Sequence, residues 1–336
     1  MSGQVWSVPA EGGYLYADNL SDYLRMALQP RCKFRQMCDA TDKALGLNRG
    51  DTYNWNVYSN VKTNGGPLAE TSRLPETNFT AHQRSLTIQE YGNSVPYTGK
   101  LESLGEHDVK DIIDKTLMDD CMKTIDRAAA YQFFQTKLRA APTGGTATDS
   151  VTITESGTTG ITNNVAMGND HVKAIIDEMK ERNIPAFEGD DYACVTHPTT
   201  IRGFKNDLED INKYTETGIA RVYSGEVGRY ESCRFVEQNN IPKGHANDAA
   251  FTNGSSGAYS IFTDGDEAWN NAKSSWAMFM GGDTVLEAPS IMEEIRGKLP
   301  SDYGRDKGIA WYFLGEFGIA HDQAENSRIV MWDSAA

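Results

Sequence analysis

The chain lacks the features that mark secreted, membrane-spanning and disulfide-bonded proteins. Residues 1–6 contain no basic start and no apolar stretch, so the sequence predicts no secretion signal. Only five cysteines are scattered over 336 residues, an odd number that is typical of free thiols in a reducing compartment. No charge-free apolar run has the length of about 20 residues that crosses a bilayer, so no membrane partner is expected.

The sequence also lacks the motifs of enzyme chemistry. It has no phosphate-binding loop, no dinucleotide fingerprint and no nucleophile elbow with the required spacing. The acidic turn at 264–267 begins like a calcium loop but lacks the glycine and the glutamate that such a loop needs. The six histidines are far apart, and His197, beside Pro198, is interpreted as a hydrogen-bonding residue of a turn. We therefore predict no catalytic residue, no cofactor and no metal site. Sequence spacing does not exclude a nucleophilic Cys/His pair, because the two side chains of such a pair come together only in the folded protein.

Positive charge is scarce. The net charge is −15 and the sequence pI is about 4.9, whereas proteins that bind DNA through its phosphates usually have a basic patch and a high pI. An acidic wall can still enclose DNA without holding it. One basic run near the N-terminus contains no acidic residue, and we expect it to pair with acids of a neighbouring copy in preference to phosphates. The run consists of Arg25, Arg31, Lys33 and Arg35.

The clearest pattern that is present is a long hairpin at 51–101. Its first arm, 52–61, alternates between apolar residues such as Trp55 and polar residues, which predicts a half-buried strand. A turn-rich loop at 64–67 leads to a second extended arm at 83–91. An isolated two-stranded hairpin is marginally stable in water, so we expect it to lie on another copy of the chain.

One uninterrupted helix is predicted directly after the hairpin, over 104–138. The segment from Ser103 to Glu106 fits a capping box, which satisfies the free amides of a first helical turn. About 33 residues at about 1.5 Å per residue form a helix about 50 Å long, long enough to span a whole subunit. Charged residues on its other faces exclude a membrane span. The apolar residues that recur every four positions are Val109, Ile113, Leu117, Cys121 and Ile125.

The rest of the chain mixes helices and strands without a regular alternation, which predicts an α+β fold. The Thr-, Gly- and Ser-rich segment 142–166 is either a weak pair of edge strands or a mobile loop. A helix after Asn169, a short buried strand at 192–196 and a helix after Pro198 follow it. The strands predicted further on are 221–236, 258–262 and a C-terminal antiparallel meander of 291–298, 308–320 and 328–332.

This order of elements resembles the major capsid proteins of tailed bacteriophages, which have the Johnson fold. The resemblance is carried by a Gly-x-x-Gly-x-x-x-x-x-Arg-hydrophobic-hydrophobic-Glu pattern at 225–237 and by a His-Pro step before a helix at 197–198. The segment 295–298, continuing to 308–311, resembles strands of the peripheral lobe in the same branch of capsid proteins. The resemblance covers nearly the whole chain in order.

The resemblance implies a structural protein of the virion and no enzyme. The chain would assemble in the host cytoplasm, as pentamers and hexamers, into an icosahedral shell that encloses double-stranded DNA without strong binding. A separate scaffolding protein, a portal and decoration proteins are the implied partners, because the N-terminal arm leaves no room for a scaffolding segment. The implied parts are an N-terminal arm at 1–50, an extended hairpin loop at 51–101, a peripheral domain at 102–169 and 286–336 with the spine helix at 104–138, and an axial domain at 170–285.

Inter-subunit contacts are expected from the hairpin and from the basic run. Some relatives join a hairpin lysine covalently to a neighbour's asparagine, and Lys62 is the one lysine before the hairpin tip, although nothing in the sequence marks its partner. Two rival hypotheses stay open, an encapsulin-like compartment shell with the same fold and a cytoplasmic enzyme with an unrecognised site. The expected contact residues are Trp55, Lys62, Arg73, Leu74, Arg25, Arg31, Lys33 and Arg35.

Overall fold

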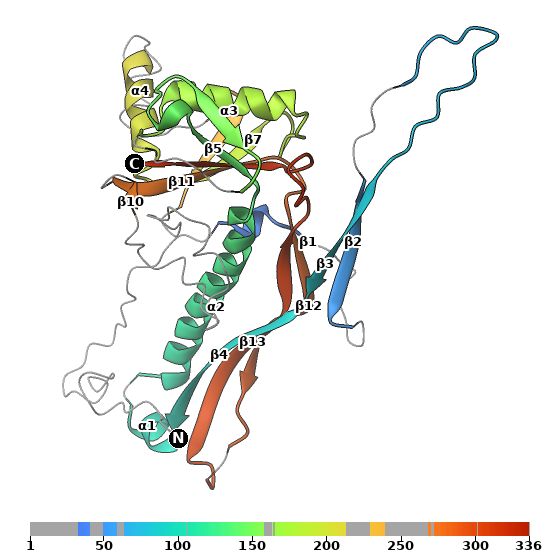
Figure 1. Ribbon diagram of the computed structural model, residues 1–336. Helices are drawn as coiled ribbons and strands as arrows, with labels where there is room; N and C mark the ends of the chain where they lie inside the picture. The colour runs from blue at the N-terminus through green and yellow to red at the C-terminus, as the bar shows by residue number, and fades with distance from the viewer. Residues whose placement is uncertain are drawn as a thin grey trace.

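The structure is a computed structural model, and it shows an α+β fold with two sheets, one long helix and a projecting hairpin (Figure 1). This confirms the fold class predicted from the sequence. The predicted strand at 258–262 and the acidic turn at 264–267 lie outside the residues that the structure describes. Those residues are 33–40, 50–58, 64–105, 107–157, 163, 165–212, 229–238, 268–269, 272–300 and 302–335.

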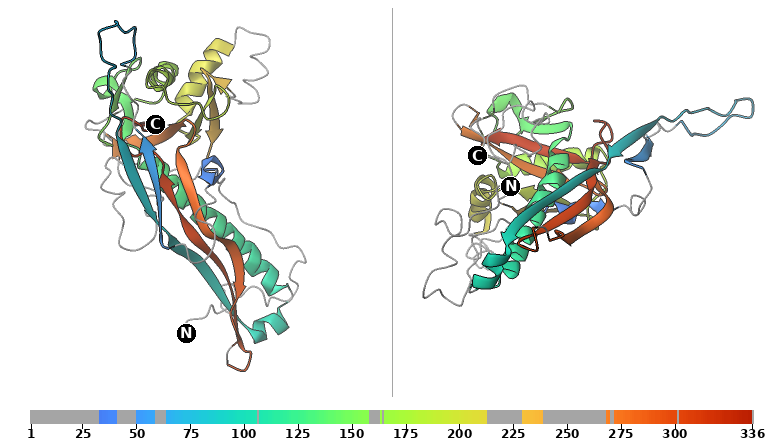
Figure 2. Two further views of the ribbon diagram at one scale, coloured as in Figure 1. Left: turned by 90° about the vertical axis from the view of Figure 1, so that its right-hand side faces the viewer. Right: turned by 90° about the horizontal axis from the view of Figure 1, so that it is seen from below.

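The long helix is α2 (Val109–Phe134), and its predicted apolar stripe is buried. Ile113 and Leu117 are each 1% exposed, and they pack in one cluster with the aromatic residues of the neighbouring sheet. At about 1.5 Å per residue, its 26 residues span about 39 Å. Figure 2 shows α2 running along one face of that sheet, as a spine helix would.

The predicted boundaries of this helix are wrong at both ends. A separate helix, α1 (Gly99–Leu104), ends at Gly105, whose extended backbone breaks the helical path. Ser103 lies in α1 and donates to the Gly99 carbonyl oxygen at 2.9 Å, so it does not form the predicted capping box. The N-cap of α2 is Asp108, whose Oδ1 accepts from the Lys110 amide at 2.9 Å.

A four-stranded sheet lies against α2, in the order β1-β12-β13-β4. Its inner face presents Phe313 and Phe317, both fully buried, to the helix. The second hairpin arm, predicted as one strand at 83–91, is divided between two strands. The chain leaves the hairpin at Ile88 and continues as β4 beside β13. The strands of this sheet are β1 (Asp39–Ala40), β4 (Gln89–Thr98), β12 (Val285–Gly297) and β13 (Asp306–Ile319).

The second sheet is mixed and follows the path β6-β5-β14-β11-β7-β9-β8, with β10 also paired to β11. The helices α3 (Asn169–Glu181) and α4 (Arg202–Asn212) confirm the two helices predicted in this region. An edge strand pair is present at the start of the segment 142–166, because β6 pairs with β5. The strands are β5 (Leu138–Pro142), β6 (Val151–Thr154), β7 (Tyr192–Thr196), β8 (Arg229–Tyr230), β9 (Cys233–Glu237), β10 (Ala268–Trp269), β11 (Ala272–Met280) and β14 (Ile329–Ala335).

The prediction that β14 closes a C-terminal meander is wrong. β14 pairs with β11 and β5 in the second sheet, although β12 and β13 do pair with each other as predicted. Ile329 and Met331 belong to the core beside α2, whereas Val330 and Trp332 belong to the core under α3. A strand buried on both faces has a continuous apolar sequence instead of an alternating one. The domain boundaries stay a prediction; the pairing places β5, β6 and β14 in the same sheet as β7.

The hairpin consists of β2 (Thr52–Tyr58) and β3 (Ala81–Thr87), which pair antiparallel with Trp55 opposite Arg84. The predicted alternation is confirmed, because every second residue of β2 is partly buried and the others are exposed. The right-hand view in Figure 2 shows the hairpin reaching well beyond the two sheets.

Candidate assembly surface

The base of the hairpin is fastened to its own chain. The indole nitrogen of Trp55 donates to the carbonyl oxygen of Ala320 at 3.1 Å. Gly318 makes room for this ring, since a Cβ there would lie 3.1 Å from Trp55 Cη2 and 3.2 Å from a methyl group of Leu86. The indole of Trp55 thus has an anchoring role within the chain, and its predicted contact with a neighbouring subunit stays a prediction.

A second contact joins the hairpin to the body, and a third closes the hairpin at its foot. The guanidinium of Arg84 pairs with the carboxylate of Asp322 at 3.1 Å. The Ile88 amide donates to the Asp51 carbonyl oxygen at 2.8 Å, which closes the hairpin at its foot. The hairpin is therefore held out in one direction by contacts within the subunit.

Among the residues that the structure describes, none gives the outer part of the hairpin comparable support. All residues from 64 to 80 are exposed. Contacts across this loop between described residues include the hydrogen bond from Asn64 to Thr77 at 3.1 Å and the edge-to-face packing of Tyr58 on Phe79. The loop carries Arg73 and Leu74, two of the expected contact residues, and Leu74 is 74% exposed. Their contact with a neighbour stays a prediction, and Lys62 lies outside the described residues.

Exposed apolar side chains gather on this loop and at the adjoining end of β2, and sequence reasoning missed three of them. Tyr58, Leu68 and Phe79 are each more than half exposed, as is Leu74. Removing apolar surface from water gains about 25 cal/mol per Å², so a loop of this kind is stabilised when another surface covers it. The sequence did contain a signal for these residues, because they are apolar side chains within an otherwise polar, turn-rich stretch.

Two further exposed apolar sets also went unnoticed in the sequence. Met118 and Met122 lie one turn apart on α2, on the face opposite its buried stripe, and their spacing of four residues was a readable signal. Met292 and Ile295 lie on the outer half of β12, where no strand covers the second edge among the described residues. These side chains offer additional surface to neighbouring subunits.

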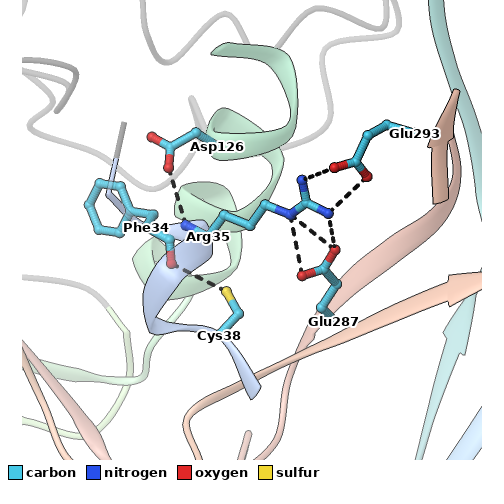
Figure 3. A network of polar contacts seen from close by, with 6 residues as sticks. All are labelled: Phe34, Arg35, Cys38, Asp126, Glu287 and Glu293. Atoms are coloured by element: carbon cyan, nitrogen blue, oxygen red, sulfur yellow. Dashed lines mark hydrogen bonds and ion pairs between the residues drawn. The ribbon is translucent and has the colours of Figure 1, made fainter. Parts of the chain in front are cut away.

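The basic run is only partly described, and its one fully placed guanidinium has partners in its own chain. Arg35 donates to both oxygens of Glu287 and of Glu293, with four of these five distances between 2.9 and 3.1 Å (Figure 3). Arg35 therefore already has acidic partners within the subunit, and its pairing with acids of a neighbour stays a prediction. The hydrogen bond from Arg35 lowers the pKa of the Glu293 carboxyl, although partial burial opposes that shift. Lys33 is partly buried, whereas Arg25 and Arg31 lie outside the described residues.

The segment around Arg35 is packed firmly against α2. Phe34 is fully buried, and its ring lies 5.5 Å from that of Phe133 and 5.7 Å from that of Phe134. The Arg35 amide donates to Asp126 Oδ1 at 3.1 Å, and Gln238 donates to the other oxygen of the same carboxylate at 2.9 Å. The buried Asp126 thus joins the N-terminal segment to the end of β9.

The charged residues of the 225–237 pattern have structural partners. Arg234 donates to Asp191 at 2.9 Å and to Glu188 at 2.6 Å, which ties β9 to the turn before β7. Glu237 pairs with Lys205 of α4. Residues 225–228 lie outside the described part of the chain. The described half of the pattern therefore holds the second sheet and α4 together.

The candidate chemical residues of the described part of the chain have structural roles. Among them no group of three or more His, Cys, Asp or Glu side chains is arranged to hold a metal ion. His197 accepts from the Thr199 amide at 3.1 Å through Nδ1, which makes it a turn residue as predicted. Searching the described helices for one that is long and apolar enough to cross a membrane finds none.

Comparisons with known proteins identify the fold. No protein-family model and no curated protein sequence matches the chain. The head structure of Helicobacter pylori bacteriophage KHP40 matches with a TM-score of 0.68 and 13% identity, covering 95% of both chains. The capsid of cyanophage Pam1 matches with a TM-score of 0.67 and 15% identity over 95% of this chain and 96% of that one. The capsid of cyanophage P-SCSP1u matches with a TM-score of 0.64 and 11% identity over 99% and 97%. The chain therefore has the Johnson fold of tailed-phage capsid proteins over nearly its whole length, as the sequence resemblance implied.

Proposed function

We propose that this chain is the major capsid protein of a tailed bacteriophage, which assembles into the shell around a double-stranded DNA genome. The single observation that carries the proposal is the unsupported outer hairpin, on a fold that matches phage capsid chains from end to end. A loop with three exposed apolar side chains, near the exposed Tyr58 at the end of β2, is stabilised when a neighbouring subunit covers it.

The assembly follows from contacts that are weak singly and strong together. A subunit that several neighbours hold at once gains effective concentration for each further contact. Contacts between different surfaces of identical copies, of which the hairpin is one partner, build closed rings such as pentamers and hexamers when the rotation closes. A scaffolding protein, a portal, decoration proteins and assembly in the host cytoplasm complete the proposal.

The charge balance supports containment of DNA instead of tight binding. The chain carries 47 acidic and 32 basic side chains, and the described Arg35 is already occupied by two carboxylates. A wall of this charge lets DNA move during filling and release. The three matching structures named above are all phage heads or capsids. No observation favours the encapsulin-like alternative or an enzyme.

Electron microscopy of the expressed chain tests the proposal. Negative-stain images and sedimentation over a range of protein concentrations should show closed particles of uniform diameter. A variant in which a short Gly-Ser linker replaces residues 64–79 should stay soluble and folded by circular dichroism but make no closed particles, because every residue of that loop is exposed in the single subunit.

A second deletion provides the control. Removing residues 299–303 between β12 and β13, of which 299, 300, 302 and 303 are exposed, and joining the strands by a two-residue turn shortens another surface loop and should leave particle formation intact. Particles that form normally without 64–79 would contradict the role given to the hairpin. Wild-type protein that remains a monomer at every concentration would contradict the shell itself, and protein cargo in place of nucleic acid would point to a cellular compartment.

A further inference from the structure

The longest strand pair of the molecule contains an irregularity at its middle. β12 pairs with β13 at Pro289 opposite Gly315 and again at Glu294 opposite Tyr312, so five steps along β12 match three along β13. Two extra residues are therefore accommodated in β12. Bulges of this kind bend the strand and increase its local twist. Figure 1 shows the β12–β13 ribbon changing direction on its way from the second sheet to the tip of the molecule.

One arginine spans this bend. Glu287 precedes the bulged stretch and Glu293 lies at its far end, and the guanidinium of Arg35 binds both carboxylates (Figure 3). The Nη2 atom alone donates to Glu287 Oε1 at 2.9 Å and to Glu293 Oε2 at 3.0 Å. The planar guanidinium has a fork of donors that can hold two carboxylates at fixed angles, which a lysine ammonium does not.

The arginine is itself anchored to a rigid element. The Arg35 amide donates to Asp126 in α2, and the adjoining Phe34 is packed between two phenylalanine rings of the same helix. The guanidinium carbon also lies 5.9 Å from the centre of the Phe313 ring in β13. The contacts of Arg35 thus connect the spine helix α2 to the part of β12 before the bulges (the upper half) and to the part after them (the lower half).

We propose that Arg35 is a positioning residue that fixes the bend of β12 and thereby the angle between the tip and the body of the subunit. Building on the shell function proposed above, that angle sets the angle between neighbouring subunits and hence the curvature and diameter of the shell, because exposed apolar side chains lie on both sides of the bend, on the hairpin loop and at Ile295. The ladder hydrogen bonds are interrupted where β12 has two extra residues, so they do not fix the bend angle of the strand by themselves. Binding of both carboxylates to one guanidinium fixes that angle.

The two carboxylates differ in burial, and this difference allows a clean test. The Glu287 side chain is 9% exposed, whereas that of Glu293 is 42% exposed. Removing Glu293 releases the lower half of β12 without leaving an unpaired buried charge, because Arg35 still neutralises Glu287. Glu294 is a matched control, since it is the next residue of the strand, is exposed and is paired with Arg296.

The experiment compares full-length wild type, Glu293→Ala, Arg35→Lys and the control Glu294→Ala. Hydrogen exchange is followed by mass spectrometry in free subunits, and particle diameters are measured in assembled shells. Glu293→Ala and Arg35→Lys should exchange about tenfold faster over 290–297, as expected for loss of a hydrogen bond between charged groups. Both should give shells with a broadened or shifted diameter distribution, whereas Glu294→Ala should match wild type in both measurements.

The two measurements separate the parts of the inference. Exchange over 290–297 that stays at the wild-type rate in both variants would overturn the bracing role of Arg35. Faster exchange with an unchanged distribution of diameters would overturn its control of curvature. Should wild-type protein make no shells, the proposed function fails, but the exchange rates of free subunits still decide whether Arg35 holds the bend.

Discussion

The indole N–H of Trp55 donates to the carbonyl oxygen of Ala320 at 3.1 Å, a contact across 265 residues that holds the foot of the hairpin on the body. The same subunit leaves the outer loop of that hairpin unsupported. Contacts within the chain therefore set the direction of the hairpin, and we expect another subunit to cover its outer loop. This division explains how a segment with little internal packing can present itself to a neighbour in a reproducible direction.

Trp55→Phe should loosen the hairpin without unfolding the subunit. Phenylalanine keeps most of the ring beside Gly318 but has no N–H, and a hydrogen bond of this kind contributes about 1 kcal/mol. Limited proteolysis of free subunits should cut within 64–80 in both proteins, while hydrogen exchange in β2 and β3 should be about fivefold faster in the variant. Equal exchange rates would mean that Arg84 and the β ladder hold the hairpin by themselves.

Leu117→Ala should lower the free energy of unfolding by about 2–5 kcal/mol, because Leu117 is 1% exposed in the core between α2 and the four-stranded sheet. The neighbouring Met118 is 61% exposed and provides the control, since Met118→Ala should change stability by less than about 0.5 kcal/mol. Urea unfolding of free subunits measures both. Leu117→Asp should be insoluble or unfolded, and free tolerance of it would contradict the packing of the spine helix.

Glu316→Gln should stabilise the subunit at neutral pH. Burial raises the pKa of the Glu316 carboxyl, while hydrogen bonds from the Phe317 amide and the Tyr91 hydroxyl oppose the shift. Because the folded state raises the pKa of this carboxyl, the folded protein loses stability as the pH rises from the unfolded-state pKa to the folded-state pKa. The variant should therefore unfold at higher urea concentration than wild type at pH 7, and the difference should shrink below the ordinary carboxyl pKa of about 4.3. A gap that persists at low pH would mean that the gain arises elsewhere.

The sequence contained the local structure but not the long-range pairings. Alternation in β2 and the four-residue spacing in α2 were readable because they depend on neighbours in the chain, whereas Asp108 displaced Ser103 as the helix cap only because Gly105 broke the backbone path. The two carboxylates that bind the Arg35 guanidinium lie more than 250 residues away, so local sequence carries no sign of them. Exposed apolar residues at the hairpin tip were visible in the sequence, but their exposure was not.

Purified subunits should show little affinity for duplex DNA at physiological salt. The chain has a pI of about 4.9, whereas cationic proteins bind non-specific duplex with dissociation constants of about 10⁻⁴–10⁻⁶ M. Replacing Arg25, Arg31 and Lys33 together by glutamine leaves the Arg35 contacts in place, and it should disturb assembly more than it changes the DNA retained in filled particles. Gel-shift titration of subunits and nucleic-acid content per particle measure the two effects. Tight, salt-sensitive binding by free wild-type subunits that is lost in the triple variant would show that the basic run holds DNA, and the containment hypothesis would then be wrong.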